Sequence, residues 1–325
     1  MFGSIWQWLY LGQCFAEMVT SCCSFTFLKR RLLYIINPIA GTGSRSSLRA
    51  LIQQQSNLAG LPFEIIDSSK EGNYECVAQQ ILEQEITDVI IAGGDGTVSQ
   101  VIAGLKHTHV SFGILPCGSG NGLARAAMIP LSMQAAIQLV IEGKSQLTDG
   151  FLINDQFACM LSGLGFDARV AHSFAQQPGR GLYTYAKEVL RHFGQAKPYT
   201  FRIQIDQTSI DTEAYLINVA NGNQYGNNFT IAPKAKLDDQ LLDVVLITKQ
   251  SKLSLIWETI RQLTGQHPIV EPHPDNSQLK VIYWQVKELH VENTANAPLH
   301  IDGDPASTLR KINFKTLPQA FALIR

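Results

Sequence analysis

The sequence predicts an α/β domain followed by a mainly antiparallel β domain. Three observations support this prediction: short apolar runs alternate with helical stretches up to about residue 148, glycine-rich loops follow several of these runs, and β-type alternation dominates from Asp149 onward. Buried parallel strands give continuous apolar runs, whereas antiparallel strands with one solvated face alternate apolar and polar residues. A chain of 325 residues is also long enough for two domains of roughly 150 residues each.

The composition limits the classes of function. Hydrophobic residues make up 45% of the chain and charged residues 16%, and the 26 basic and 27 acidic side chains nearly cancel. This balance argues against a bulk electrostatic grip on nucleic acid, so we expect no nucleic-acid partner. The 6 cysteines show neither a Cys-x-x-Cys pair nor a zinc-type spacing with histidine, which favours a reducing, cytoplasmic setting.

Residues 1–30 form a hydrophobic leader that we separate from the folded domains. The leader is rich in aromatic side chains, contains Glu17, and ends against Lys29, Arg30 and Arg31. Polar residues dilute it as a membrane-spanning helix, and it lacks the basic start and small-residue cleavage site of a signal peptide. We expect an interfacial segment that contacts anionic headgroups, with an irregular or non-native leader as the alternative.

The first domain, residues 31–148, is predicted from a repeated order of strand and helix. The predicted strands are Leu32–Ile36, Pro62–Asp67, Asp88–Ala92 and Val110–Pro116. The helical stretches are Ser46–Ala59, Tyr74–Gln84 and a segment that continues through Ile102. Because each glycine-rich loop follows a strand, we expect the loops at the carboxyl edge of the sheet, where open α/β sheets bind ligands.

The second domain, residues 149–325, is predicted from segments with β-type alternation and turn signals between them. The predicted strands are Tyr199–Asp206, Ala214–Ala220, Leu241–Thr248, Leu279–Val286, Lys287–Glu292 and Pro298–Asp304. Helices are expected at about Tyr183–Phe193 and Leu253–Leu263.

The loop Gly93–Ser99, with the sequence GGDGTVS, indicates a phosphate-binding function. Glycines let the backbone approach a phosphate without a Cβ in the way, and the N–H groups at a helix start favour anions. Asp95 does not attract phosphate by charge, so it is predicted to hold Mg²⁺ or to take a proton from an attacking hydroxyl. The structural alternative is a tight turn with a helix-capping aspartate.

Two further loops, Asn37–Ser44 and Leu115–Arg125, also end a predicted strand and open a helix. We therefore expect their helix N-termini to converge with Gly93–Ser99 on one polyanion. Neither loop carries a Walker A or dinucleotide-binding fingerprint, and the chain contains no Gly-x-Ser-x-Gly elbow. These absences argue against a Walker-type ATPase, a Rossmann oxidoreductase and an α/β hydrolase.

The motifs NPIAG, GGDGTVSQV and LPCGSGNGLAR, in this order and spacing, resemble the catalytic domain of the diacylglycerol kinase and sphingosine kinase superfamily, especially its bacterial soluble lipid kinases. SGLGFDARV, APKAKLDDQLLDVVLI and IDGDP resemble the second-domain signatures, so the resemblance extends from about Leu32 to the end. GGDGT alone is shared with NAD kinases and their phosphofructokinase-like relatives. The resemblance implies a three-layer α/β domain of that kind followed by a β-sandwich, with ATP and lipid meeting between them.

The resemblance also implies roles for individual residues. Asp95 and Asp304 would be catalytic, and either one is a candidate for the general base. Asp95 would hold Mg²⁺, Asp239 would hold a second, structural Mg²⁺, and Asp167 would contact the head group of the substrate. The implied nucleotide contacts are Asn37, Ser68, Gly93, Gly94, Asp95, Gly96, Thr97, Val98, Ser99, Gly118, Ser119 and Asn121.

Four positions, in three motifs, depart from the family pattern. Ser99-Gln100 replaces the usual Asn-Glu, which alters the hydrogen bonding expected in the loop. Gln240 replaces the usual glycine of Asp-Gly-Leu-Leu, and because a glutamine takes up positive φ at a cost, the second metal site is placed in doubt. Asp304 replaces a glutamate and is one methylene shorter, so either the substrate lies closer or Asp95 is the base.

The sequence therefore predicts an ATP-dependent, Mg²⁺-dependent phosphotransferase that acts on a hydroxyl of diacylglycerol or a sphingoid base. We expect it in the cytoplasm, in peripheral contact with the membrane that presents the lipid, with an apolar cleft in the second domain. The stretch Ser173–Gly194 is a candidate for membrane contact, or else an ordinary amphipathic helix. The alternatives are a soluble-metabolite kinase of the NAD kinase type, and a catalytically silent regulator suggested by Ser99, Gln100, Gln240 and Asp304.

Overall fold

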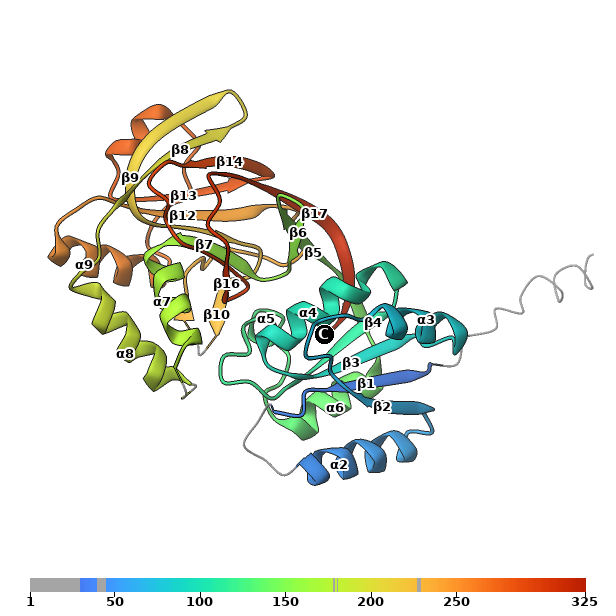
Figure 1. Cartoon of the computed structure of the whole chain (residues 1–325). Coiled ribbons are helices and arrows are strands. Elements are labelled where there is room, and N and C mark those ends of the chain that lie inside the picture. Colours follow the sequence, from blue (N-terminus) through green and yellow to red (C-terminus); the bar gives the residue numbers. More distant parts are fainter. Residues whose placement is uncertain (1–29, 40–44, 178, 180, 227–228) are drawn as a thin grey trace, which may run out of the picture.

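The computed structural model describes residues 30–39, 45–177, 179, 181–226 and 229–325 (Figure 1). The predicted interfacial leader up to residue 29, and residues 40–44 of the first glycine-rich loop, lie outside the described residues. The described chain forms an α/β lobe followed by a β lobe, which confirms the predicted fold class (Figure 1).

The α/β lobe is built on a parallel sheet with the strand order β4-β3-β1-β2. Its strands are β1 (Leu32–Ile36), β2 (Phe63–Asp67), β3 (Asp88–Gly93) and β4 (Ser111–Pro116). Successive residues of β1 point to opposite faces, so Leu33 and Ile35 enter one core while Tyr34 and Ile36 enter the other. Both faces are buried, which explains why the strand reads as an unbroken apolar run.

Helices cover both faces of this sheet and give the predicted three layers (Figure 1). Side chains of α2 (Arg45–Leu58) and α6 (Met133–Glu142) belong to one core, and those of α3 (Glu75–Glu83) and α4 (Asp95–Leu105) belong to the other. The short α5 (Gly122–Ala126) follows β4, and a single 3-10 turn, η1 (Lys106–Thr108), follows α4.

The β lobe is largely antiparallel, as predicted, and encloses its own core around Trp284, Phe201 and Phe314. Its longer strands are β8 (Tyr199–Ile205), β9 (Thr208–Ala220), β12 (Leu242–Thr248), β13 (Val281–Val286) and β14 (Glu288–Asn293). Its short strands are β6 (Gln156–Ala158), β7 (Leu161–Gly165), β10 (Gln224–Gly226), β11 (Phe229–Thr230), β15 (Leu299–Ile301) and β16 (Asp304–Ala306). Its helices are α7 (Phe166–Ala175), α8 (Leu182–Phe193), α9 (Lys252–Leu263) and the 3-10 helix η2 (Pro274–Gln278). No helix in the described part of the chain combines the length and the apolar character needed to cross a bilayer.

Two long strands, β5 (Ser145–Ile153) and β17 (Lys311–Ile324), join the lobes (Figure 1). They pair antiparallel with each other, and the end of β17 also pairs with β4, where Ala322 lies opposite Ser111. The strands of the two lobes thereby connect into one mixed sheet. The domain boundary predicted between residues 148 and 149 falls inside β5.

Asp149 fixes the bend at which these two strands pass between the lobes. The pairing of β5 with β17 shifts register between Leu317 and Phe321, and Gln319 in this gap has φ 51°. The buried carboxylate of Asp149 accepts the N–H of Gln319 at 2.7 Å through Oδ1 and the N–H of Gln240 at 2.7 Å through Oδ2. One side chain thus holds both the bend in β17 and the loop that precedes β12.

Candidate active site

The loops that follow β3 and β4 touch at the carboxyl edge of the parallel sheet. A Cβ added to Gly118 would lie 2.6 Å from the Cα of Gly94, so this approach requires glycine. Asn121 holds the second loop in place, since its Oδ1 accepts the Gly118 N–H at 2.9 Å and its Nδ2 donates to the Gly118 carbonyl at 2.8 Å. The structure therefore brings together three predicted nucleotide contacts: Gly94, Gly118 and Asn121.

The first glycine-rich loop is tied to Thr97 through Asn37. Asn37 Nδ2 donates to Thr97 Oγ1 at 2.6 Å, and its Oδ1 accepts the N–H of Ile39 at 3.0 Å. A Cβ on Gly93 would lie 2.7 Å from the Cβ of Thr97, so the threonine side chain fills the space that this glycine leaves. These predicted residues, Asn37, Gly93 and Thr97, form the support of the loop.

The remaining predicted nucleotide contacts occupy different environments. The N–H of Ser68 donates to the Ile36 carbonyl at 2.9 Å, which keeps the loop after β2 beside the end of β1. Ser119 is exposed at the tip of its loop. Val98 donates its N–H to Gly94 at 3.0 Å and buries its side chain in the core, so it contributes packing beneath the loop.

Asp95 lies at the start of α4 and caps the neighbouring α5. Its Oδ1 accepts the N–H of Gly122 at 2.6 Å, which matches the capping alternative. Burial raises the pKa of Asp95, hydrogen bonds from the N–H groups of Gly122, Asn121 and Leu123 lower it, and the charge of Asp302 raises it, with a net value of about 6. The Asp95 carboxylate thus occupies the N-terminus of α5, while the convergence of the helix N-termini on one polyanion stays a prediction.

Asp304 reaches the first turn of α4 from the other lobe. The turn between β15 and β16 contains Asp302 at φ 49° and Gly303 at φ 88°, and it points the exposed Asp304 toward Gly96. A Cβ on Gly96 would lie 3.2 Å from Asp304 Oδ2, so the absence of a side chain there makes room for the carboxylate. The two predicted catalytic residues thus both lie at the first turn of α4: Asp95 belongs to this turn and accepts an N–H from α5, and Asp304 approaches Gly96 from the other lobe.

Asp302 locks this turn to both lobes, and sequence reasoning missed it. Ser99 on α4 donates its hydroxyl to Asp302 Oδ2 at 2.5 Å. The same buried carboxylate accepts the backbone N–H groups of Cys159, Met160 and Leu161 at 3.0, 2.9 and 3.0 Å. The motif IDGDP carried the available signal, because an aspartate immediately before a glycine is suited to a tight positive-φ turn.

Asp167, the predicted head-group contact, is linked to the Asp304 turn through His300. Asp167 lies buried in the first turn of α7, and its Oδ2 is 3.4 Å from His300 Nε2. His300 Nδ1 accepts the N–H of Gly303 at 3.3 Å, directly beside Asp304. Burial and the charge of Asp167 raise the pKa of Tyr185 on α8. Sequence reasoning also missed His300, since no local pattern pairs it with a residue of α7.

Asp239 lies in a separate environment, next to the glutamine that placed the second metal site in doubt. Gln240 adopts φ 64°, the left-handed conformation expected to be costly, because its N–H is held by Asp149 and the next N–H, of Leu241, donates to Asp239 Oδ1 at 3.1 Å. The pKa of Asp239 is raised, chiefly by burial and also by the charges of Asp149 and Asp238. Asp95 is not among the charges acting on it, so the structure does not join the two predicted metal residues in one site.

The donor set around Asp95 fits Mg²⁺ only together with a phosphate ligand. No group of three or more His, Cys, Asp or Glu side chains within the described residues could hold a metal ion alone. Mg²⁺ commonly takes one or two carboxylates and completes its shell with water and phosphate oxygens. Asp95 offers a hard oxygen donor, and the burial that chiefly raises its pKa, together with the charge of Asp302, disfavours the ionised carboxylate in a way that a bound cation would offset.

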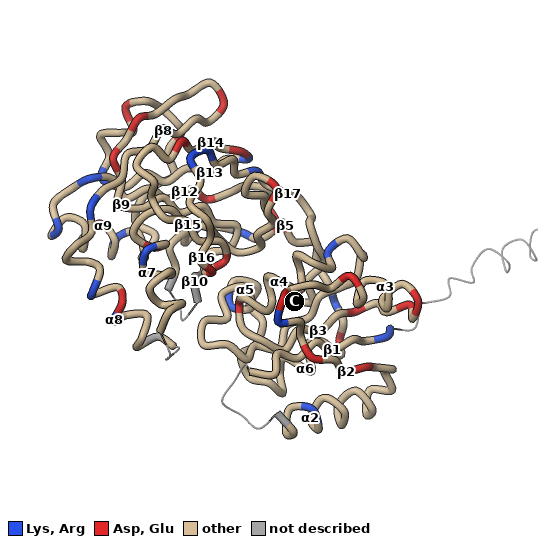
Figure 2. Tube along the Cα trace, in the orientation of Figure 1, with Lys and Arg blue, Asp and Glu red and all other residues tan. Residues whose placement is uncertain are grey.

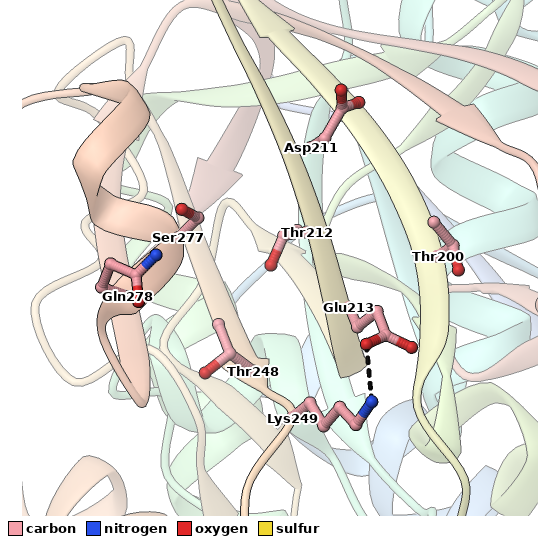
Figure 3. Close-up of a pocket in the computed structure, with 8 residues that line it drawn as sticks. All are labelled: Thr200, Asp211, Thr212, Glu213, Thr248, Lys249, Ser277 and Gln278. Atoms are coloured by element: carbon pink, nitrogen blue, oxygen red, sulfur yellow. Dashed lines mark hydrogen bonds and ion pairs between the residues drawn. The ribbon is translucent and has the colours of Figure 1, made fainter.

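Two pockets in the described part of the chain lie away from Asp95, Asp304 and the glycine-rich loops. A pocket of about 390 Å³ opens on the β lobe, and a Lys249–Glu213 ion pair of 2.7 Å lies in it (Figure 3). It is lined by Thr200, Asp211, Thr212, Glu213, Thr248, Lys249, Ser277 and Gln278. These polar side chains include no described residue predicted for the site, so this pocket is not the apolar cleft expected for a lipid. A second pocket, of about 550 Å³, lies beside α3 and α4.

Comparison with known proteins gives matches along both lobes. The family model described as the diacylglycerol kinase catalytic domain matches residues 31–152, and the model described as the YegS C-terminal NAD kinase beta sandwich-like domain matches residues 161–325. A diacylglycerol kinase of Staphylococcus saprophyticus is 28% identical over 90% of this chain and 94% of its own. A probable lipid kinase, YegS-like, of Chromohalobacter salexigens is 28% identical over 70% of this chain and 73% of its own.

A solved structure shares the fold. A diacylglycerol kinase from Bacillus anthracis matches with a TM-score of 0.69 at 20% identity, over 91% of this chain and 96% of that chain.

Proposed function

The chain belongs to the family of lipid kinases that combine a diacylglycerol kinase catalytic domain with a YegS-type C-terminal domain, and on this premise we propose that it transfers the γ-phosphate of ATP to a hydroxyl group of a lipid. The proposed acceptor is diacylglycerol or a sphingoid base, and the proposed metal is Mg²⁺. The observation that carries the proposal is the approach of Asp304 from the β lobe to Gly96, the residue after Asp95 in the first turn of α4, where the glycine leaves room for a carboxylate.

Phosphoryl transfer asks the protein to align two reactants and to balance charge on the phosphate oxygens. In the loop Gly93–Ser99, the glycines leave parts of the backbone uncovered by side chains. Gly118 keeps a second backbone segment close to Gly94 of this loop. We assign nucleotide binding to this edge, with Ser68 and Ser119 at its margins. An acceptor hydroxyl would reach the same place from the β lobe.

The two carboxylates have different surroundings, which suggests a division of roles. Asp304 is exposed on a turn of the β lobe, so it can meet the hydroxyl of an acceptor and take its proton during attack. Asp95 has one oxygen committed to the Gly122 N–H, and we assign it to holding Mg²⁺. When bound, Mg²⁺ would neutralise charge that develops on the phosphate oxygens.

The lipid acceptor requires a membrane as a partner, so we propose peripheral contact with a bilayer surface. The predicted head-group contact Asp167 supports an acceptor on the β lobe, because it is connected through His300 to the Asp304 turn. The regulator hypothesis loses one of its reasons: Ser99 replaces the usual asparagine, yet its hydroxyl serves to bind Asp302 across the lobes.

The test is transfer of label from γ-labelled ATP with Mg²⁺ to acceptors in detergent micelles. Diacylglycerol, sphingosine, ceramide and monoacylglycerol are offered separately, with NAD as the soluble alternative. Label in a lipid product is the expected result and identifies the acceptor. Label in NAD alone, or label nowhere with protein that binds ATP, would contradict the proposed function and favour one of the two alternatives.

A further inference from the structure

Helix α9 presents a large apolar face to solvent. Leu253, Ile256, Trp257 and Ile260 are 82, 47, 62 and 50% exposed. Their spacing of i, i+3, i+4 and i+7 places them together along one side of the helix. We call these four side chains the α9 apolar face. On a folded protein, a contiguous exposed apolar surface rimmed by polar residues marks an interaction site.

The opposite side of α9, which packs on the β lobe, is unusually polar. Its buried residues are Leu255, Glu258 and Gln262. Glu258 is paired there with Arg261 and His267, each at 3.2 Å. Helices of globular domains normally turn the apolar side inward and the polar side outward. These inward polar groups bond to the lobe, since Gln262 Nε2 donates to the Ile231 carbonyl at 2.9 Å, while the apolar side chains of the outer face stay in solvent and are available to an apolar partner.

Helix α8 lies against the start of α9 and extends the same region (Figure 1). Lys252 Nζ donates to the carbonyls of Phe193 and Ala196, both at 2.8 Å, and so ties the end of α8 to α9. Tyr183 and Leu190 on α8 are themselves 84 and 76% exposed. The α9 apolar face therefore stands beside a second helix that also leaves large side chains in solvent.

The charges of these two helices select the kind of partner. Among the described side chains of α8 and α9, the exposed or half-exposed charges are basic, and they include Lys187, Arg191 and Arg261 (Figure 2). The acidic members, Glu188 and Glu258, are both buried. Apolar side chains flanked by cations, with the acids withdrawn, suit the interface of an anionic bilayer. A second copy of the chain would bring the same cations toward one another across a symmetric contact.

We propose that the α9 apolar face is the surface by which this protein docks on an anionic phospholipid bilayer, with the cations of α8 and α9 at the headgroups. This docking surface adds a membrane-binding role to the proposed lipid kinase function, and the proposal rests on that function. Helix α8 packs on α7, and α7 packs on β16, which begins at Asp304. Docking through α9 therefore places the membrane against the lobe that carries the proposed acceptor side.

The test compares vesicle binding of three forms of the full chain by co-sedimentation. The first is the wild type and the second is Ile256→Gln with Ile260→Gln. The third is a matched control, Leu58→Gln with Leu82→Gln, which changes two exposed apolar side chains, 76 and 72% exposed, on α2 and α3 of the other lobe. The vesicles are phosphatidylcholine alone and phosphatidylcholine mixed with phosphatidylglycerol. All substituted residues are exposed, and thermal unfolding checks that each form is folded.

Wild type and control are expected to bind the mixed vesicles equally. The α9 variant is expected to bind them more weakly by about tenfold or more, because it lacks two isoleucines that docking would bury in the bilayer. Equal binding by all three forms, or no binding by the wild type, would overturn the proposal. A wild-type dimer that the α9 variant converts to a monomer in light scattering would also overturn it and assign the face to a second copy. Co-sedimentation measures vesicle binding and requires no turnover. Its result therefore stands even if the proposed kinase activity is not found.

Discussion

Asp95 is the residue in which structural and chemical demands conflict. Its carboxylate is buried, it accepts an N–H from α5, and it lies near Asp302, with the result that its pKa rises from 3.8 to about 6. Between these two pH values the native protein holds a proton that the unfolded chain has released. The free energy of unfolding therefore falls as pH rises through this window, by about 3 kcal/mol at this site.

The variant Asp95→Asn removes this penalty and keeps an oxygen that accepts the Gly122 N–H. We expect it to be more stable than the wild type by about 3 kcal/mol near pH 7 and close to it near pH 4, measured by urea unfolding. A variant less stable than the wild type near pH 7 would show that the ionised carboxylate is stabilised by the fold.

The same substitution should lower turnover. If the ionised Asp95 holds Mg²⁺, Asp95→Asn reduces kcat by about 100-fold or more. For the same reason the wild-type kcat/KM should decline as pH falls below about 6, where Asp95 takes up its proton. A pH profile that is flat through this region, or near-wild-type turnover in the variant, would remove Asp95 from the mechanism.

Gly96 tests whether the approach of Asp304 matters. A Cβ in Gly96→Ala would stand 3.2 Å from Asp304 Oδ2, so the Asp304 carboxylate must give way by a few tenths of an ångström. Because alanine favours a helix, we expect the free energy of unfolding to stay equal or rise by up to about 1 kcal/mol, while kcat falls about tenfold or more. Gly194→Ala is the control, since its backbone is helical and a Cβ there meets nothing within 4 Å. Equal turnover of the two variants would contradict the role given to this contact.

At the scale of elements, the β15–β16 turn is held by its contact with α4. Ser99→Ala leaves the buried Asp302 with its backbone donors and the Cys159 thiol, and we expect a loss of about 1–2 kcal/mol in the free energy of unfolding. Ser111→Ala, which removes a surface hydroxyl contact with Ser145 of 3.2 Å, is the control and should change stability by less than about 0.5 kcal/mol. Similar losses for both variants would show that the Ser99 contact is not special.

The elements that the sequence predicted are those whose signals are local. Apolar runs such as Leu32–Ile36 and Asp88–Gly93, and the glycines that follow them, encode strand and turn within a few residues. Helix α7 was not predicted because it continues directly from β7 through Gly165 at φ 95°, and the apolar, glycine-rich stretch reads as strand throughout. Helix α6 was likewise absent from the prediction.

The contacts that complete the site were beyond any local pattern. Ser99 and Asp302 are separated by 203 positions, and Asp167 and His300 by 133. The identities of Asp95 and Asp304 followed from motifs, whereas the residues that position them depend on how the two lobes are joined. This is why the resemblance to lipid kinases named the carboxylates and left Asp302 and His300 unassigned.

At the scale of the whole molecule, the lobes are joined by paired strands instead of a flexible linker. β5 and β17 run from one lobe to the other, and Ala322 pairs with Ser111 across more than two hundred positions. The sequence pattern changes between residues 148 and 149, from continuous apolar runs to β-type alternation, but strand β5 continues through this boundary. The approach of the β15–β16 turn to α4 is therefore set by the course of these two strands.

Asp149 tests this construction. Asp149→Ala leaves the N–H groups of Gln240 and Gln319 without their acceptor in a buried setting, and we expect it to lower the free energy of unfolding by about 2–5 kcal/mol. Asp149→Asn retains one acceptor oxygen and should fall between this variant and the wild type in urea unfolding. A loss below about 1 kcal/mol in Asp149→Ala would show that the bend is held by the strands alone.

The measurement that tests the central claim most directly is turnover of Asp304→Asn and Asp304→Glu with γ-labelled ATP and the acceptor identified for the wild type. We expect Asp304→Asn to lower kcat by about 100-fold or more while its Kd for ATP and for the lipid stays unchanged. Asp304→Glu keeps the carboxylate and should retain most of the activity. Near-wild-type turnover in Asp304→Asn, with both ligands bound normally, would contradict the proposal that the meeting of the two lobes at α4 is the active site.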